Sequence, residues 1–333
     1  MHLKGGCGLI PQLKLSSMFN SLTYFGLIAI ARITSIFPLF LIHGISDLIS
    51  LIAYYIVRYR RKVVRVNLKH SFPDKNISEI ISIEKRFYRY FTDYFMETMM
   101  SRFISEKRLS RHFVYKNAEL INSYFVKNRS IILVTAHLGS FEMSLQMPKF
   151  IRHKVMAVYK PQSNKGFDMF FVKLRERCGI EAVPMNAIGK RIYQNVCNNT
   201  PSVTYLLSDQ RPDRLNVRYW TMFLNQETPV LLGPERLSVK YNQVVLFLSV
   251  KRIKRSFYEA SFELIEDNPQ TTKEYEITEK LTRHLEKLIK ADPSIYFWTH
   301  RRWKHRRFID FIKMVNKTPD SPGVAYNHDL IHF

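Results

Sequence analysis

The stretch Ile131-Ile-Leu-Val-Thr-Ala-His-Leu-Gly-Ser-Phe-Glu142 decides the fold class of this chain. Its first six residues, 131–136, are apolar or β-branched, as is typical of a buried strand. We predict a helix over 140–150, which places His137 at the carboxyl end of the strand and Glu142 in the first turn of the helix. Active groups of α/β proteins most often lie at this end of the strands.

The same alternation of short apolar runs and helical stretches continues along the chain. Further strands are predicted at 155–159, 203–207 and 244–250, with a hairpin strand at 257–264, and further helices at 168–178, 187–197, 233–241 and 273–291. We therefore expect an α/β protein with a mixed central sheet flanked by helices. Before this region, Asn76 and Glu79 have the spacing of a capping box, and the apolar residues that follow predict a long amphipathic helix up to Met99.

The segment 18–42 is predicted to associate with a membrane. It carries one formal charge, Arg32, and its 25 residues are long enough to cross the hydrocarbon layer of about 30 Å. However, a central arginine costs about 2.5–3.5 kcal/mol on insertion scales, and Pro38 interrupts the backbone hydrogen bonds. Shallow burial at the membrane interface and a buried hairpin of a soluble core therefore remain as alternatives. A secretory signal peptide fits less well, because no small-residue cleavage site follows.

The charge of the chain favours phosphate-rich or anionic-membrane partners. Lysine and arginine number 51 against 28 acidic residues, which gives a formal net charge of +23. A second apolar stretch, 45–57, is followed by six basic residues with no acid before Asp74, which predicts a cytoplasmic location for this flank: Arg58, Arg60, Arg61, Lys62, Arg65 and Lys69. The three cysteines are too scattered for a disulfide framework or a zinc site, so we expect no metal.

His137 and Glu142 are candidates for a general base and its partner. A carboxylate on one ring nitrogen fixes the tautomer of a histidine, so that the other nitrogen can remove a proton from a hydroxyl. The hydroxyl of the acceptor substrate would then attack an acyl carbonyl directly. The spacing alone is weak evidence, because any histidine followed five residues later by an acid would match, so a structural histidine and a helix-capping acid remain alternatives. Ser140 is disfavoured as a nucleophile, because its surroundings lack the Gly-x-Ser-x-Gly pattern.

Several blocks of the chain, in their order, resemble the bacterial lipid A biosynthesis acyltransferases, the late or secondary acyltransferases of that pathway. The blocks are Arg65-Val-Asn-Leu68 with Ser71-Phe-Pro-Asp74, His137-Leu-Gly-Ser-Phe-Glu142, Val158-Tyr-Lys-Pro161 with Arg175, Ser208-Asp-Gln210, Thr228 with Gly233-Pro-Glu235, and Trp298-Thr-His-Arg-Arg-Trp-Lys304. Two positions depart from the family pattern. Lys160 stands where many members have arginine. A lysine keeps the positive charge but cannot form the two parallel hydrogen bonds of a guanidinium group. Glu235 replaces a small residue, so we expect disturbed packing there.

The resemblance implies a glycerolipid-acyltransferase-like fold and a cofactor-free O-acyltransferase. Its donor would be an acyl carrier protein and its acceptor a hydroxyl of a lipid A precursor. The resemblance makes His137 the general base and Glu142 its partner. It also implies location at the anionic surface of the bacterial inner membrane, with the catalytic domain facing the cytoplasm. Five further residues are implied as substrate-binding: Lys160, Arg175, Asp209, Arg301 and Arg302.

We divide the chain into a leader (1–17), a membrane anchor (18–57), an acyltransferase domain (58–307) and a tail (308–333). One alternative keeps the chemistry but changes the acceptor to another glycolipid or an aminolipid. Another is a non-enzymatic basic protein that binds membranes or nucleic acid. No recognisable nucleic-acid motif supports that alternative, so we expect no nucleic-acid partner.

Overall fold

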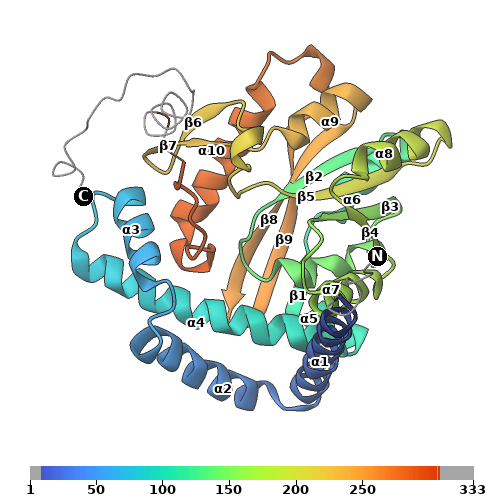
Figure 1. Cartoon of the computed structure of the whole chain (residues 1–333). Coiled ribbons are helices and arrows are strands. Elements are labelled where there is room, and N and C mark those ends of the chain that lie inside the picture. Colours follow the sequence, from blue (N-terminus) through green and yellow to red (C-terminus); the bar gives the residue numbers. More distant parts are fainter. Residues whose placement is uncertain (1–8, 306, 308–333) are drawn as a thin grey trace, which may run out of the picture.

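The strand 131–136 forms the centre of a mixed sheet, as predicted. The structure is a computed structural model that describes residues 9–305 and 307, so residues 1–8 of the predicted leader and the predicted tail 308–333 lie outside the described residues (Figure 1). The seven strands have the order β1-β9-β8-β2-β5-β3-β4. All neighbouring pairs are parallel except β8 and β9. Their bounds are β1 Phe113–Tyr115, β2 Ile131–Thr135, β3 Lys154–Tyr159, β4 Glu181–Pro184, β5 Ser202–Leu207, β8 Val244–Lys254 and β9 Phe257–Glu266.

Four strands were not predicted from the sequence. The edge strands β1 and β4 have only three and four residues, too few for a visible apolar period. A separate hairpin consists of β6 Trp220–Phe223 and β7 Gln226–Pro229. Its turn residues Leu224 and Asn225 both have positive φ angles, as a tight hairpin turn requires.

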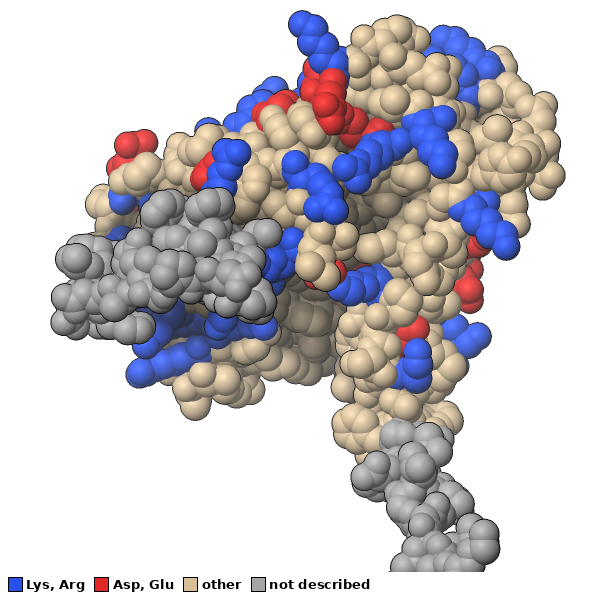
Figure 2. Space-filling view, turned by 45° about the horizontal axis from the view of Figure 1, so that its top comes forward, with Lys and Arg blue, Asp and Glu red and all other residues tan. Residues whose placement is uncertain are grey.

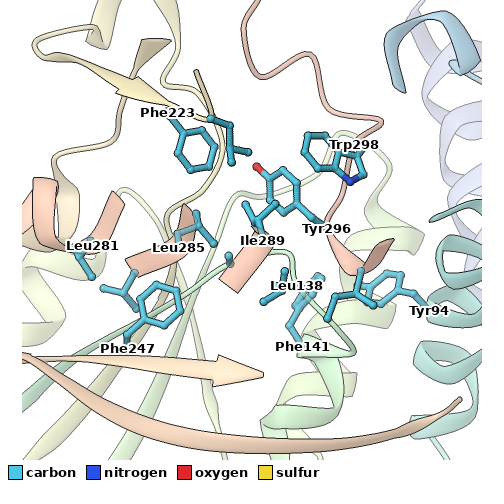
Figure 3. Close-up of a cluster of buried hydrophobic side chains, with 14 of the residues drawn as sticks. Tyr94, Leu138, Phe141, Phe223, Phe247, Leu281, Leu285, Ile289, Tyr296 and Trp298 are labelled. Carbon is cyan, nitrogen blue, oxygen red and sulfur yellow. The ribbon is translucent and has the colours of Figure 1, made fainter. Parts of the chain in front are cut away.

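Helices cover both faces of the sheet. Alternate residues of β2 belong to two different apolar clusters: Ile132 and Val134 to one, Ile131 and Leu133 to the other. Figure 3 shows part of the first cluster, in which Leu281, Leu285 and Ile289 of one helix lie near Phe247 of β8. The helices of the domain are α3 Arg61–Ser71, α4 Ile77–Ser101, α5 Glu106–His112, α6 Ala118–Val126, α7 Lys165–Glu176, α8 Ile188–Cys197, α9 Gly233–Tyr241 and α10 Glu276–Ala291.

The predicted long helix is α4, and its capping box is confirmed. The Asn76 side chain accepts a hydrogen bond from the Glu79 amide, and the Glu79 carboxylate accepts one from the Asn76 amide. The predicted helix 140–150 instead forms a 3₁₀ helix, η2, at Phe141–Lys149, with Pro148 inside it. Proline cannot donate the backbone hydrogen bond that an α-helix needs at this position.

The disturbed packing expected at Glu235 is not found. Its carboxylate accepts hydrogen bonds from the backbone amides of Tyr275 (2.6 Å) and Thr278 (2.8 Å). These amides lie at the N-cap (Tyr275) and in the first turn (Thr278) of α10, where no intrahelical acceptor is available. The charge is therefore satisfied by the start of a helix, and the negative carboxylate complements the positive end of its dipole.

The apolar N-terminal region forms two helices that join at Pro38. They are α1 Leu9–Ile36 and α2 Leu39–Leu51, and α2 continues into a short π-helical segment, η1 Ile52–Ile56. Both pack along α4, and α1 also packs on α7, at the lower edge of the view in Figure 1. By length and composition, Met18–Ile36 and Leu39–Ile56 are each long enough to cross a membrane. Most of their large apolar side chains are exposed, so this region is not a buried hairpin of a soluble core.

Candidate active site

His137 and Asp209 meet because their strands are parallel neighbours in matching register. In the β2–β5 pair, Thr135 lies opposite Leu207. Each strand is followed, two residues later, by a polar side chain: His137 after β2 and Asp209 after β5. Their side chains form a hydrogen bond of 2.8 Å between His137 Nδ1 and Asp209 Oδ1.

The environment of this pair favours an ionised carboxylate beside the imidazole. The Asp209 side chain is 2% exposed and that of His137 is 21% exposed. Burial alone would raise the pKa of Asp209, but the charge and the hydrogen bonds of His137 outweigh burial and hold this pKa below its usual value. When Nδ1–H donates to Asp209, the lone pair of Nε2 is able to accept a proton. The Gln210 side-chain amide nitrogen lies 3.3 Å from Nε2.

Glu142 does not contact His137, which differs from our expectation. Its Oε1 accepts a hydrogen bond of 2.8 Å from Arg175 Nη2 of α7. Its second oxygen, Oε2, is buried without a hydrogen-bond partner among the described residues. The tight 3₁₀ turn places Phe141 against the His137 ring, with 4.9 Å between the ring centroids. The Glu142 carboxylate is therefore paired with Arg175, and not with His137 as its position in the sequence had suggested.

The turn between β2 and η2 requires a glycine at position 139 and is supported by α4. Gly139 has a φ of +62°, and a Cβ built there would lie 2.7 Å from Val250 Cγ1, so a larger residue is excluded on both counts. The Gly139 carbonyl accepts a hydrogen bond of 2.8 Å from the Tyr90 hydroxyl of α4. On the same helix, Tyr94 stacks on Phe141 at 5.0 Å. The helix α4 therefore supports the loop that carries His137.

The chain matches a known protein family over most of its length. The family model described as bacterial lipid A biosynthesis acyltransferase matches residues 12–305. The chain belongs to this family. The resemblance stated from the sequence blocks is thereby confirmed.

Similar proteins include a lipid A biosynthesis acyltransferase of Haemophilus influenzae, which is 25% identical over 74% of this chain and 78% of its own length. A lipid A biosynthesis palmitoleoyltransferase of Escherichia coli is 23% identical over 90% of this chain and 97% of its own length. A lipid A biosynthesis acyltransferase of Shigella flexneri has the same identity and coverage.

The other expected site residues of this acyltransferase fall into two groups. Lys160 is exposed at the surface, where its Nζ lies 3.3 Å from Asp213 Oδ2, and Arg301 is exposed as well. Arg175 and Arg302 are turned inward. The Arg302 Nη1 donates hydrogen bonds to Thr228 Oγ1 (2.5 Å) and to the Pro229 carbonyl (2.8 Å). Arg302 thus stabilises the hairpin β6–β7, and its buried guanidinium is not exposed for the expected phosphate contact.

Buried polar groups of the C-terminal block surround Asp209. Burial lowers the pKa of His300 to about 4, so this imidazole is neutral near pH 7. Burial and the neighbouring Asp209 charge raise the pKa of the Tyr296 hydroxyl well above its usual value. A cavity of about 30 Å³, lined by Asp209 and Arg302 among others, lies behind the carboxylate and has room for one water. The sequence patterns did not connect these residues, because Asp209 lies far along the chain from Tyr296, His300 and Arg302.

Basic side chains predominate on one face of the acyltransferase. Figure 2 shows lysines and arginines that outnumber the acidic residues there and border a hollow. Such a face attracts anionic ligands over distances up to the Debye length, about 8–10 Å at physiological salt. It agrees with the preference for phosphate-rich or anionic partners inferred from the net charge of +23.

The Glu142–Arg175 ion pair is predicted to be structural. Arg175→Ala leaves the Glu142 carboxylate buried without its cation, and removing one partner of a buried pair typically costs about 3–5 kcal/mol. Urea unfolding in detergent solution, followed by circular dichroism, measures the change. Lys173→Ala on the exposed side of the same helix is the matched control and should have an effect below about 0.5 kcal/mol. Equal stability of the two variants would contradict this assignment.

Proposed function

We propose that this acyltransferase moves a fatty acyl chain from an acyl carrier protein thioester to a hydroxyl of a lipid A precursor, with His137 as general base. The observation that carries the proposal is the hydrogen bond between His137 and the buried Asp209 carboxylate. This arrangement makes Asp209, and not Glu142, the residue that orients the base. Glu142 keeps a positioning role through Arg175, whose helix flanks the site.

The proposed reaction needs no nucleophile from the protein. Nε2 of His137 takes the proton of the acceptor hydroxyl while the oxygen attacks the thioester carbonyl. A C–O bond forms, the C–S bond breaks, and the thiolate of the carrier takes the proton back from the imidazolium. The products are an ester on the lipid and a free carrier thiol. Asp209 stabilises the transient imidazolium, and the Gln210 amide lies beside Nε2, where the hydroxyl must arrive.

Charge and relatives support the proposed donor and acceptor. An acyl carrier protein is acidic and a lipid A precursor carries phosphates, so both suit a chain with a net charge of +23. Lys160 and Arg301 are exposed and able to contact such groups, unlike the buried Arg302. The relative from Escherichia coli is named for transfer of a palmitoleoyl group, which supports a long fatty acyl donor.

The proposed location is the inner membrane of a bacterium, with the catalytic domain facing the cytoplasm. The exposed apolar faces of α1 and α2 and the basic residues that follow them support this location. Another glycolipid or an aminolipid remains the alternative acceptor, with the same base. Because the chain belongs to an acyltransferase family, the alternative of a non-enzymatic basic binding protein is no longer favoured.

Replacement of His137 is expected to abolish acyl transfer. The experiment is mass spectrometry of lipid A from a host that lacks its late acyltransferases, with this protein, its His137→Ala variant, or the exposed-histidine control His70→Ala. A mass gain of one fatty acyl group should appear with the unchanged protein and with His70→Ala only. A gain with His137→Ala would refute the proposed base. No gain with any folded form would refute the lipid A acceptor, and new acylated species among total lipids would identify another.

Replacement of Asp209 is expected to reduce the rate more than replacement of Glu142. In Asp209→Asn the amide no longer stabilises the imidazolium and no longer selects the Nδ1–H tautomer, so kcat should fall by about 10²–10⁴. Glu142→Gln retains an acceptor for Arg175 and should fall by about tenfold or less. Both are assayed as release of free carrier thiol from acyl carrier protein. A larger loss for Glu142→Gln, in protein of unchanged stability, would show that Glu142 and not Asp209 supports the base.

A further inference from the structure

The helix α2 is amphipathic with its polar side turned toward the protein. Ser46 and Ser50 are buried against the domain, whereas Leu48 is 60% exposed and Ile56, just beyond the helix, is 75% exposed. Helices of soluble domains have the opposite arrangement, with the apolar stripe facing the core. The outward face of α2 is therefore suited to apolar surroundings.

Polar contacts of residues 43–47 hold this helix to the domain. Asp47 accepts hydrogen bonds of 2.8 Å from Arg255 of the β8–β9 turn and from Arg89 of α4. Ser46 donates a hydrogen bond of 2.6 Å to Asp93 of α4. One turn earlier, His43 Nε2 lies 2.8 Å from the Ser256 hydroxyl. Asp47 is near the middle of Leu39–Ile56, so the centre of this apolar segment is fixed to charged groups of the catalytic domain.

The helix α1 is attached to the domain in the same way. The Asn20 side-chain oxygen accepts a hydrogen bond of 3.1 Å from the Lys165 amide at the start of α7. The Ser35 carbonyl accepts one of 3.2 Å from Arg108. Gly166 allows a very close approach, because a Cβ there would lie 1.9 Å from the Asn20 carbonyl oxygen. Contacts thus extend over 20–35, about 24 Å of helix at 1.5 Å per residue.

The N-terminal helical region exposes apolar side chains on both α1 and α2 and is followed by positive charge. Its exposed apolar residues include Leu22, Phe25, Ile36, Phe40, Leu48 and Ile56. Soluble monomers rarely expose apolar patches larger than a few hundred Å². The exposed basic residues Arg58, Arg60 and Lys62 follow directly after η1. Basic residues beside an apolar face match the anionic headgroups and acyl chains of a lipid surface.

We propose that α2 lies in the plane of one leaflet of an anionic membrane and does not cross it. If α2 crossed, Asp47 would reach the middle of the bilayer together with Arg255 and Asp93, to which it is tied. Charged groups at that depth are costly, and α4 carries further charges along its surface. The in-plane arrangement keeps all these groups on the protein side. The proposal rests on the membrane location in the proposed function and adds the orientation of the helix, but its test does not depend on acyl transfer.

This arrangement brings the active site close to the lipid surface. The helix α4 contacts α2 on one side, while its Tyr90 donates to Gly139 in the loop that carries His137. The helix α4 therefore links α2 to the active-site loop, and the diameter of a helix is about 10–12 Å. A lipid acceptor is then able to reach His137 while its acyl chains stay in the leaflet.

The depth of α2 in the membrane tests the proposal. Spin labels are placed at Leu41, Leu48 and Tyr55, which are seven residues apart and all exposed. The native cysteines Cys7, Cys178 and Cys197 are first replaced by serine, and the full chain is bound to vesicles of phosphatidylethanolamine and phosphatidylglycerol. The in-plane arrangement predicts similar depths for all three labels, about 5–10 Å. A label at Leu48 near the bilayer centre, with the other two near opposite surfaces, would overturn it.

A second measurement distinguishes a lipid partner from a second copy of the chain. Leu48→Glu should weaken binding to the same vesicles about tenfold or more, because it replaces lipid contact by a charge. Leu264→Glu makes the same change at an exposed leucine of β9 and should leave binding unchanged. The proposal is wrong if both variants bind equally. It is also wrong if the labelled chain forms dimers in which the same positions are shielded from a lipid-soluble quencher.

Discussion

The parallel pairing of β2 with β5 is the constraint on which the candidate site depends. His137 and Asp209 each follow their strand by two residues, and Thr135 pairs with Leu207, so both side chains arrive at the same edge of the sheet. A slip of one residue in either strand would turn its side chains to the other face. In the observed register, β2 packs against an apolar cluster on each of its two faces. The core that stabilises the fold therefore also sets the catalytic geometry.

The helix α4 connects this site with the proposed membrane surface. Tyr90 and Tyr94 support the loop from Gly139 to Phe141, while Asp93 on the same helix binds Ser46 of α2. A helix of 25 residues with buried contacts on more than one side is a rigid support. The proposed base, its loop and the helices proposed to contact the membrane are thus held in one fixed arrangement.

Local patterns predicted the elements well but not the contacts between distant residues. The capping box of α4, the central strands and the break at Pro38 are all local signals, and each is confirmed. The partner of His137 depends on which strand lies beside β2, and no local pattern contains that information. The available signal was that His137 and Asp209 each follow a predicted strand within two residues. Similarly, Arg302 was expected at a phosphate because its block is basic, whereas its burial follows from packing on β7.

The tautomer of His137 tests the central claim most directly. Nitrogen-15 NMR of the detergent-solubilised protein, labelled at histidine and assigned with His137→Ala, distinguishes a protonated ring nitrogen from one with a free lone pair. If Asp209 accepts the Nδ1 proton, the neutral imidazole should show Nδ1 protonated and Nε2 free, and this preference should disappear in Asp209→Asn. A proton on Nε2 in the unchanged protein, or a preference that persists in Asp209→Asn, would contradict the account.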